Sequence, residues 1–381
     1  FEQPPVIYPT HFFELQTNKL SVSGVDLEIQ HTPGETDDQI IIYYPEKDVV
    51  ISADNYYMRF PNLYTIRGTS YRDSKSWYKS VDAMRSYQPQ YLISCHGPFL
   101  SGKEVIEERL SIYRDAIQFI HDYAIRGANA GKTPDQLVEE FEYPAFFLEN
   151  YDLQEKYGKV SWSIRNVYNG YLGFFDGKAV NLEPLSAHKR AKHIFELIGS
   201  KEQLISEINK ANQSKNYQWA AELSDVGLLN FPNDDQIKNL YSISLENLSL
   251  VETNPIARNY YLSEAYELTN KINPSLEYTV SAEQAKNIPL STFFDAMGPR
   301  LNSEKAKNKL IKIGFNITDS DEKFGVIVRN QIAEISNSYD DSFDVIVSVD
   351  SNTWKGIVLK TVSAVQAIAS GKLKIDGESI K

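Results

Sequence analysis

The chain has 381 residues, 42% hydrophobic and 24% charged, the balance of a globular protein too long for one compact core. Its net charge of −12 is spread along the sequence, which argues against a nucleic-acid partner because phosphate neutralisation needs clustered Lys and Arg. The single cysteine, Cys95, excludes an internal disulfide framework and a cysteine-rich zinc cluster. No apolar run approaches the roughly 20 residues needed for a transmembrane segment.

Residues 1–100 are predicted to form strands and loops. Alternating apolar residues on both sides of Gly24 indicate a hairpin. The apolar runs QIIIYY and DVVISA, separated by PEK, predict two buried strands, and QYLISCHG predicts a third. The loop that follows SADN leads into a helix from about Lys75.

Residues 101–272 are predicted to be helical. Ser101 and Glu104 have the spacing of a capping box, so we expect a long helix to begin there, with one apolar face and an end at Gly131. Thr133 and Gln136 predict a second capping box on the next helix. Further on, the pattern is that of a helical hairpin interrupted at Pro232.

Residues 278–381 combine two helical stretches with the predicted strands KIGFNIT, FGVIVRN, QIAEIS and DVIVSVD. This mixture is typical of a small α+β domain. We place its boundary in TNKINPSLEYTVSAEQ, where prolines and polar residues interrupt the helical pattern.

Three potential metal ligands each follow a predicted strand or turn: Glu35, Asp54 and His96. Strand ends are where α/β enzymes commonly collect ligands, and carboxylate and imidazole groups suit zinc. The alternative is that they are ordinary turn and loop residues.

A second candidate cluster is the loop TIRGTSYRD, in which Arg67 and Arg72 lie five residues apart. A guanidinium group matches a tetrahedral oxyanion geometrically, so this pair suggests phosphate or sulfate recognition. The alternative is two solvated arginines that pair with Asp73 and its neighbours.

Several motifs together resemble one known family. In chain order, TPGETDDQ, SADN, PNLYTIRGTSYRD and SCHGPFLSGKE resemble the second half of the metallo-β-lactamase domain of alkyl sulfatases. YRDAIQFIHD, GKTPDQLVE and RNVYNGYLGFFDG resemble the helical dimerisation domain of that family, and FFDAMGPRLNSEKA and SGKLKIDG resemble its C-terminal sterol-carrier-like domain. The resemblance implies an α/β and α+β multidomain fold: half of an αββα sandwich (1–100), a helical dimerisation domain (101–272) and an SCP2-like domain (278–381).

The resemblance also assigns roles to the potential ligands. Glu35 and His96 would bind zinc, and Asp54 would bridge two zinc ions. The family usually has glutamate at the bridging position and reads Gly-Thr-Glu where this chain has Gly34-Glu35-Thr36, so Asp37 is a possible substitute for Glu35.

The implied function is zinc-dependent hydrolysis of alkyl sulfate esters to alcohol and sulfate. Arg67 would hold the sulfate, with Arg72 as a second candidate, and the chain would form a homodimer. The C-terminal domain would offer apolar cover for an alkyl chain.

The family's His-x-His-x-Asp-His motif is absent from this sequence. The six histidines are His11, His31, His96, His121, His188 and His193, and no two of them are two residues apart. His31 is an alternative ligand near Glu35, whereas His121, on the long helix, is predicted to be partly exposed. His188 and His193 fit a solvated helix start.

The chain begins with Phe1 rather than Met, and three explanations remain open for the missing motif. An upstream half that carries the remaining ligands could be cleaved from the same precursor and retained as a companion chain. It could be absent from the stated sequence, or this chain could be a paralogue that lost the motif and its activity.

Two non-catalytic alternatives follow from that third explanation: a lipid-binding protein, and a dimer partner of an active homologue. Sequons at Asn212, Asn247 and Asn316 are compatible with a secretory route, so a periplasmic or secreted location is slightly favoured.

Overall fold

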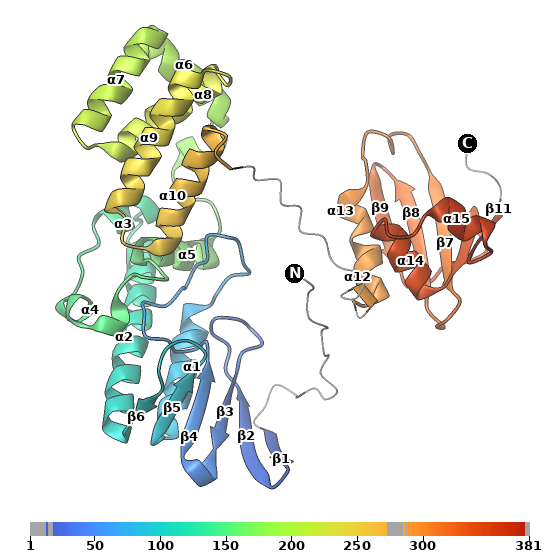
Figure 1. The fold of residues 1–381 in the computed structure, drawn as a ribbon, viewed down its shortest axis with the longest axis horizontal. Helices are drawn as coiled ribbons and strands as arrows, with labels where there is room; N and C mark the ends of the chain where they lie inside the picture. The colour runs from blue at the N-terminus through green and yellow to red at the C-terminus, as the bar shows by residue number, and fades with distance from the viewer. Residues whose placement is uncertain (1–12, 14–17, 273–284, 287, 378–381) are drawn as a thin grey trace. The chain divides into compact units, whose positions relative to one another are not determined.

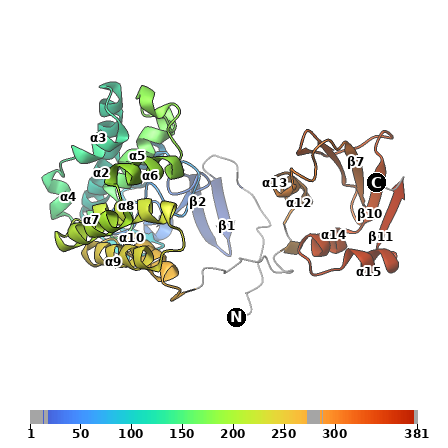
Figure 2. The same cartoon turned by 90° about the horizontal axis from the view of Figure 1, so that it is seen from above.

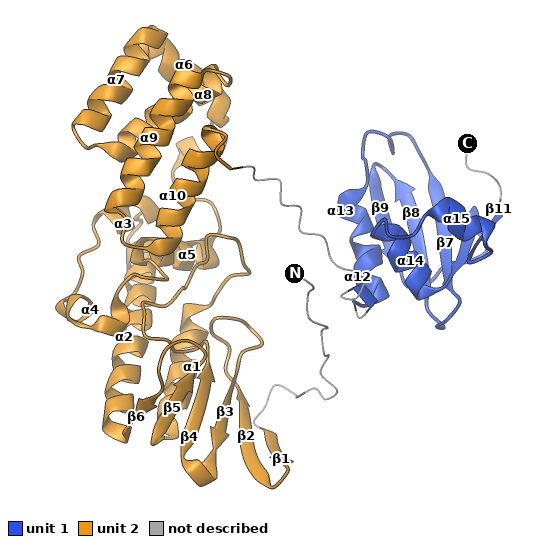
Figure 3. Cartoon of the chain, in the orientation of Figure 1, with its two compact units in different colours: residues 1–12, 276–381 blue, residues 13–275 orange. Residues whose placement is uncertain are grey.

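The computed structural model describes residue 13 and residues 18–272, 285–286 and 288–377. The chain divides into a larger compact unit within residues 13–275 and a smaller one within 276–381 (Figure 3). The predicted mixed multidomain fold class is confirmed. Most of the predicted boundary at 269–284 lies outside the described residues. None of the described helices combines the length and apolar character needed to cross a membrane.

A six-stranded sheet forms one end of the larger unit (Figure 1). Its strands, adjacent in numerical order, are β1 (Asn18–Val22), β2 (Val25–His31), β3 (Ile40–Tyr44), β4 (Val49–Ala53), β5 (Tyr91–Ser94) and β6 (Leu100–Ser101). The hairpin at Gly24 is confirmed, with a φ of +81° that glycine adopts without steric cost. Only β4 and β5 pair in parallel, so the ends of these two strands lie at the same edge.

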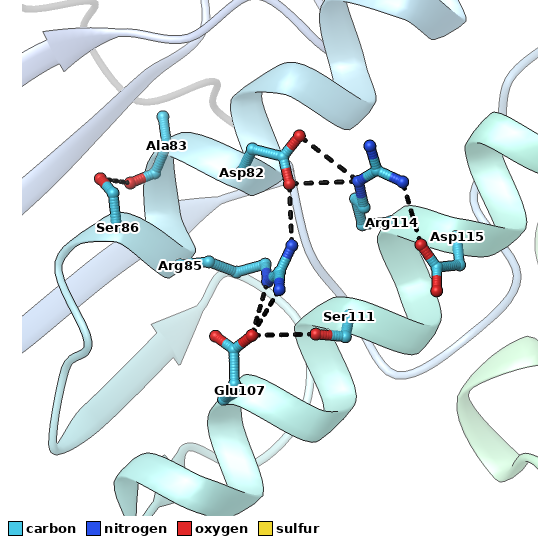
Figure 4. A network of polar contacts seen from close by, with 8 residues as sticks. All are labelled: Asp82, Ala83, Arg85, Ser86, Glu107, Ser111, Arg114 and Asp115. Carbon is cyan, nitrogen blue, oxygen red and sulfur yellow. Dashed lines mark hydrogen bonds and ion pairs between the residues drawn. The ribbon is translucent and has the colours of Figure 1, made fainter.

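Two helices, α1 (Ser74–Ser86) and α2 (Lys103–Asn129), cover one face of this sheet (Figure 1). Trp77, Met84, Leu110 and Ile117 form the centre of the shared core. At its margin, Asp82 on α1 accepts hydrogen bonds from Arg85 and Arg114, which ties the two helices together (Figure 4).

The predicted capping box at Ser101 is wrong. Gly102 is the N-cap of α2, with no side-chain capping bond. Ser101 belongs instead to β6, where it pairs with Tyr91 of β5. Ser101 is part of a strand rather than a helix cap because the chain turns back after β5 and pairs antiparallel with it before the helix begins.

The second face of the sheet is apolar on every strand from β1 to β5. In the ladder Ile42 pairs with Ile51, and Ile51 with Ile93, so their side chains share this face. The register places twelve apolar residues on this face, together with Asn18 and His31: Leu20, Val22, Val25, Leu27, Ile29, Ile40, Ile42, Tyr44, Val49, Ile51, Tyr91 and Ile93. Tyr91 and Ile93 remain 38% and 41% exposed. The predicted burial of these strands therefore holds on one face only, and we call the other the open face.

Helices make up the rest of the larger unit. They are α3 (Pro134–Glu139), α4 (Ala145–Glu149), α5 (Val160–Leu172), α6 (Ala187–Ile198), α7 (Lys201–Gln213), α8 (Tyr217–Asn230), α9 (Asp235–Val251) and α10 (Pro255–Leu268). The capping box of Thr133 and Gln136 is confirmed, as is the hairpin around Pro232 between α8 and α9. Successive helices α7 to α10 pack side by side (Figures 1 and 2).

The smaller unit has a five-stranded sheet in the order β11-β10-β7-β8-β9. These strands are β7 (Ile311–Ile317), β8 (Lys323–Arg329), β9 (Ile332–Ser336), β10 (Val345–Val349) and β11 (Leu373–Gly377), accompanied by α12 (Leu290–Asp295), α13 (Met297–Arg300), α14 (Ser351–Val358) and α15 (Ala364–Ala369). Phe294 stacks on Phe324 with ring centroids 4.1 Å apart, at the centre of a separate core.

Candidate metal and sulfate site

Asp54 and His96 meet at the edge where the parallel strands β4 and β5 end. Ala53, directly before Asp54, has a φ of +47°, an uncommon value for a residue with a side chain. His96 Nε2 lies 3.4 Å from Asp54 Oδ1, and that oxygen is buried and accepts no hydrogen bond. A buried carboxylate oxygen without a hydrogen-bond donor is suited to binding a cation or a water molecule.

Asn55 ties the loop that carries Glu35 to the strand end that carries Asp54. Its Nδ2 donates to Thr32 O at 2.7 Å, and its Oδ1 accepts from the backbone N–H of Glu35 at 3.4 Å. A Cβ on Gly34 would lie 2.0 Å from Asn55 Oδ1, so only glycine permits this close approach. Asn55 therefore holds the backbone of Glu35 in a fixed position relative to Asp54.

The Glu35 side chain is buried and ion-paired. Glu35 is 8% exposed and Arg72 5%, and Glu35 Oε1 lies 3.0 Å from Arg72 Nη1. Burial raises the pKa of Glu35, the charge of Arg72 opposes that rise, and the charge of Asp54 adds to it. The charge of Arg67 also lowers the pKa, so all four groups act within one electrostatic field.

Arg67 differs from Arg72 in that its guanidinium group has no hydrogen-bond or ion-pair partner among the described residues. Arg72 Nη1 also donates to Asn62 O at 2.7 Å, whereas Arg67 is exposed and makes no hydrogen bond or ion pair with a described residue. A turn in which Gly68 N donates to Thr65 O presents Arg67. The structure thus provides one held arginine and one available arginine beside the carboxylates.

These donors fit part of a metal centre. No three His, Cys, Asp or Glu side chains within the described residues are arranged to hold a metal ion. Asp54 and His96 supply two converging donors, one with an unpaired oxygen, whereas Arg72 engages Glu35. Burial and then the charge of Asp54 raise the pKa of the Cys95 thiol, which disfavours a thiolate ligand. The ligand set Glu35, Asp54 and His96 stays a prediction.

Two of the remaining histidines, His31 and His121, bond to neighbouring groups, whereas His11 lies outside the described residues. His31 Nε2 bonds the carbonyl oxygen of Asp37 at 2.6 Å. His121 is buried, contrary to the prediction, because Asp122 and Tyr171 satisfy its two ring nitrogens and Tyr78 packs against it. His188 and His193 are exposed on α6, as predicted.

An apolar pocket of about 480 Å³ adjoins the pair of Asp54 and His96. It is lined by Tyr57, Met58, Arg59, His96, Gly97, Pro98, Tyr151 and Tyr157. Tyr157 belongs to a segment whose carbonyl oxygens at 155, 157 and 158 accept from Asn254 Nδ2. The helical part of the chain thus builds one wall, which the sequence patterns did not indicate.

Asn62 is a second residue that sequence reasoning missed. It is 1% exposed, yet both polar atoms of its side chain lack a hydrogen-bond partner. Its neighbours, Pro61 before it and Leu63 after it, gave the pattern of an ordinary turn. The unsatisfied amide beside Arg72 is a feature that only the folded structure reveals.

Comparisons with known proteins give a consistent result. The family described as Alkyl sulfatase dimerisation matches residues 133–271, and Alkyl sulfatase C-terminal matches residues 278–381. A linear primary-alkylsulfatase from Pseudomonas sp. is 32% identical over 97% of this chain and 72% of its own length. An alkyl/aryl-sulfatase from Saccharomyces cerevisiae is 27% identical, with 99% of this chain and 59% of its own length covered.

A solved structure shows the same fold. The stereoselective inverting sec-alkylsulfatase Pisa1 from Pseudomonas sp. superposes with a TM-score of 0.92 at 26% identity, over 98% of this chain and 60% of that one. The chain therefore spans 72% of one relative and about three fifths of the other two.

Proposed function

The chain belongs to the alkyl sulfatase family, and we propose that it contributes part of a zinc site that hydrolyses alkyl sulfate esters to an alcohol and sulfate. The observation that carries the proposal is that His96 belongs both to the converging donor pair and to the wall of the apolar pocket. A sulfate ester of an alkyl chain needs both environments side by side.

Asp54 and His96 are the side chains that would hold zinc, with Glu35 as a further ligand. When bound, zinc would supply positive charge and a water molecule of lowered pKa. Arg67 would donate to the sulfate oxygens. Arg72 holds Glu35 and Asn62 in place through its two contacts.

The pocket suits the alkyl part of the substrate. Its tyrosine, methionine and proline side chains present apolar surface, and its volume of about 480 Å³ is in the range of small-molecule sites. Each methylene group buried there would contribute about 0.8 kcal/mol to binding. Chain length would then act mainly on affinity.

We propose that polypeptide outside this sequence completes the site. The open face supports this, because twelve apolar positions on five strands are the pattern of a sheet that packs against a second layer. The same layer would bring the His-x-His-x-Asp-His ligands that this sequence lacks. The name of the family matched by residues 133–271 supports a homodimer.

The test is to assemble the chain with a polypeptide that carries this motif, then measure zinc content and sulfate release from dodecyl sulfate. We expect about two zinc ions per site. His96→Ala and Asp54→Asn should lower zinc affinity at least about 100-fold, because outer-shell changes alone cost 10–100-fold. His193→Gln, on an exposed histidine, is the control.

Glu35→Gln separates two roles for that carboxylate. If Glu35 is a zinc ligand, both zinc and hydrolysis are lost. If it only holds Arg72, hydrolysis falls while zinc stays bound. An assembled protein that neither binds zinc nor releases sulfate would overturn the proposal and leave the lipid-binding or dimer-partner role.

A further inference from the structure

One side chain from the helical region binds both ends of the loop that carries the two arginines. Asn166, on α5, donates from Nδ2 to Leu63 O at 2.8 Å and to Arg72 O at 3.4 Å. These two carbonyl groups bracket the loop that contains Arg67. One amide group thus fixes the distance between the points where the loop leaves the core and returns to it.

A second contact on the same helix supports this clamp. Gly170 lies one turn beyond Asn166, on the same face of α5. A Cβ on Gly170 would lie 2.1 Å from Tyr71 Cε2, so the Tyr71 ring packs directly on the helix backbone. The loop is therefore held at its ends by Asn166 and against the helix by Tyr71.

The loop has little else to fix its available arginine. Between its ends the backbone makes one internal hydrogen bond, from Gly68 N to Thr65 O, among the described residues. Arg72 has its own anchors in Glu35 and the carbonyl oxygen of Asn62. Arg67 has none, so its position depends on the loop backbone.

We propose that Asn166 is a positioning residue that sets the affinity of the site for the sulfate group by holding the Arg67 loop. The sulfate role rests on the proposed function, whereas the clamp itself does not. Loss of a hydrogen bond of this kind lowers occupancy of the held conformation by about fivefold.

The clamp is tested first on the chain itself, by the rate at which trypsin cleaves after Arg67. Asn166→Ala should raise this rate about fivefold. Asn166→Asp keeps the shape but places a carboxylate against two carbonyl oxygens, so it should raise the rate at least as much. Asn209→Ala, an exposed asparagine on α7 that also donates to a backbone carbonyl oxygen, is the matched control and should leave the rate unchanged.

Gly170→Ala distinguishes positioning from simple helix stability. Alanine stabilises a helix relative to glycine, so an effect on α5 alone would protect the chain from trypsin. Displacement of Tyr71 should instead accelerate cleavage after Arg67 without lowering the thermal midpoint. Slower cleavage in this variant, or equal rates for Asn166→Ala and Asn209→Ala, would overturn the clamp.

The sulfate role is tested in the assembled enzyme. Asn166→Ala should raise the inhibition constant of inorganic sulfate and the KM for dodecyl sulfate by about fivefold. Zinc content should stay equal to that of Asn209→Ala, and kcat should change less than KM. Unchanged sulfate inhibition would refute the role. An inactive wild-type assembly would refute the proposed function, and the trypsin result would still decide the clamp.

Discussion

The two sheets of this protein use their second faces differently. In the smaller unit, β7, β8 and β10 bury alternate residues such as Phe315, Val326 and Val347, and the opposite face carries Lys312 and Asn316 among other polar residues. In the larger unit the face away from α1 and α2 is apolar on five strands. The first pattern is that of a finished two-layer domain, and the second is that of a sheet made to be covered on both sides.

The contrast matters because a single buried face explains alternation but not continuous apolar runs. The apolar runs QIIIYY and DVVISA are continuous because both faces of β3 and β4 carry mainly apolar side chains. The strand VIVSV of β10 contains a serine on its outer side instead. The outer faces of β3 and β4 carry no charged or amide side chain, and this, rather than the length of the apolar run, indicates a sheet that needs another layer.

The largest expected difference comes from one matched pair of substitutions. Val347→Asp places a carboxylate in the core of the smaller unit and should destabilise it by about 4 kcal/mol. Ile51→Asp lies on the open face and should cost about 1 kcal/mol in the chain alone. Urea denaturation followed by circular dichroism measures both.

Ile51→Asp should also block association with the proposed companion polypeptide. Equal costs for the two substitutions in the isolated chain would mean that the open face is already covered, and would remove the contrast between the sheets.

A smaller effect tests whether the helix-covered side of the larger unit is complete. Asp152 is buried, accepts two bonds from Arg109 at 2.9 and 3.0 Å, and accepts one from Tyr56 at 2.7 Å. Asp152→Asn should cost about 2 kcal/mol because a charge-assisted network loses its carboxylate. Asp115→Asn, in an exposed pair with Arg114, should cost at most about 0.5 kcal/mol. Similar values for both variants, from the same urea titrations, would contradict a finished core on this side.

The smallest effect concerns pH and the smaller unit. Burial alone would raise the pKa of Asp319, but bonds from the hydroxyl and backbone N–H of Ser351 outweigh it, so the pKa is lowered. A lowered folded-state pKa gives stability that is present above the unfolded-state value of about 3.9 and is lost as pH falls below it. Asp319 is exposed, so the contribution is a few tenths of a kcal/mol after solvent screening.

Asp319→Asn should therefore lower stability at pH 7 and leave it unchanged near pH 2. Comparison of unfolding midpoints at the two pH values checks this. An equal loss at both would show that the carboxylate charge has no part in it.

Local patterns predicted most of the strands and helices, and they placed Asp54 and His96 at strand ends that the structure brings together. They failed at Ser101, where pairing with β5 overrides a local capping signal, and at His121, which tertiary partners bury. Asn166 and Tyr151 were out of reach for a different reason. Their importance arises from contacts between segments about a hundred residues apart, for which no spacing rule exists.

The Asn166 clamp also sets an order of events during synthesis. Asn166 follows Leu63 by 103 residues, and Asp152 follows Tyr56 by 96. At ribosomal speeds of about 5–20 residues per second, the arginine loop emerges roughly 5–20 seconds before the helix that holds it. During that interval α1 and α2 are already available to cover the sheet, but the loop lacks the side chain that joins its two ends, so it stays exposed in the nascent chain until α5 is made.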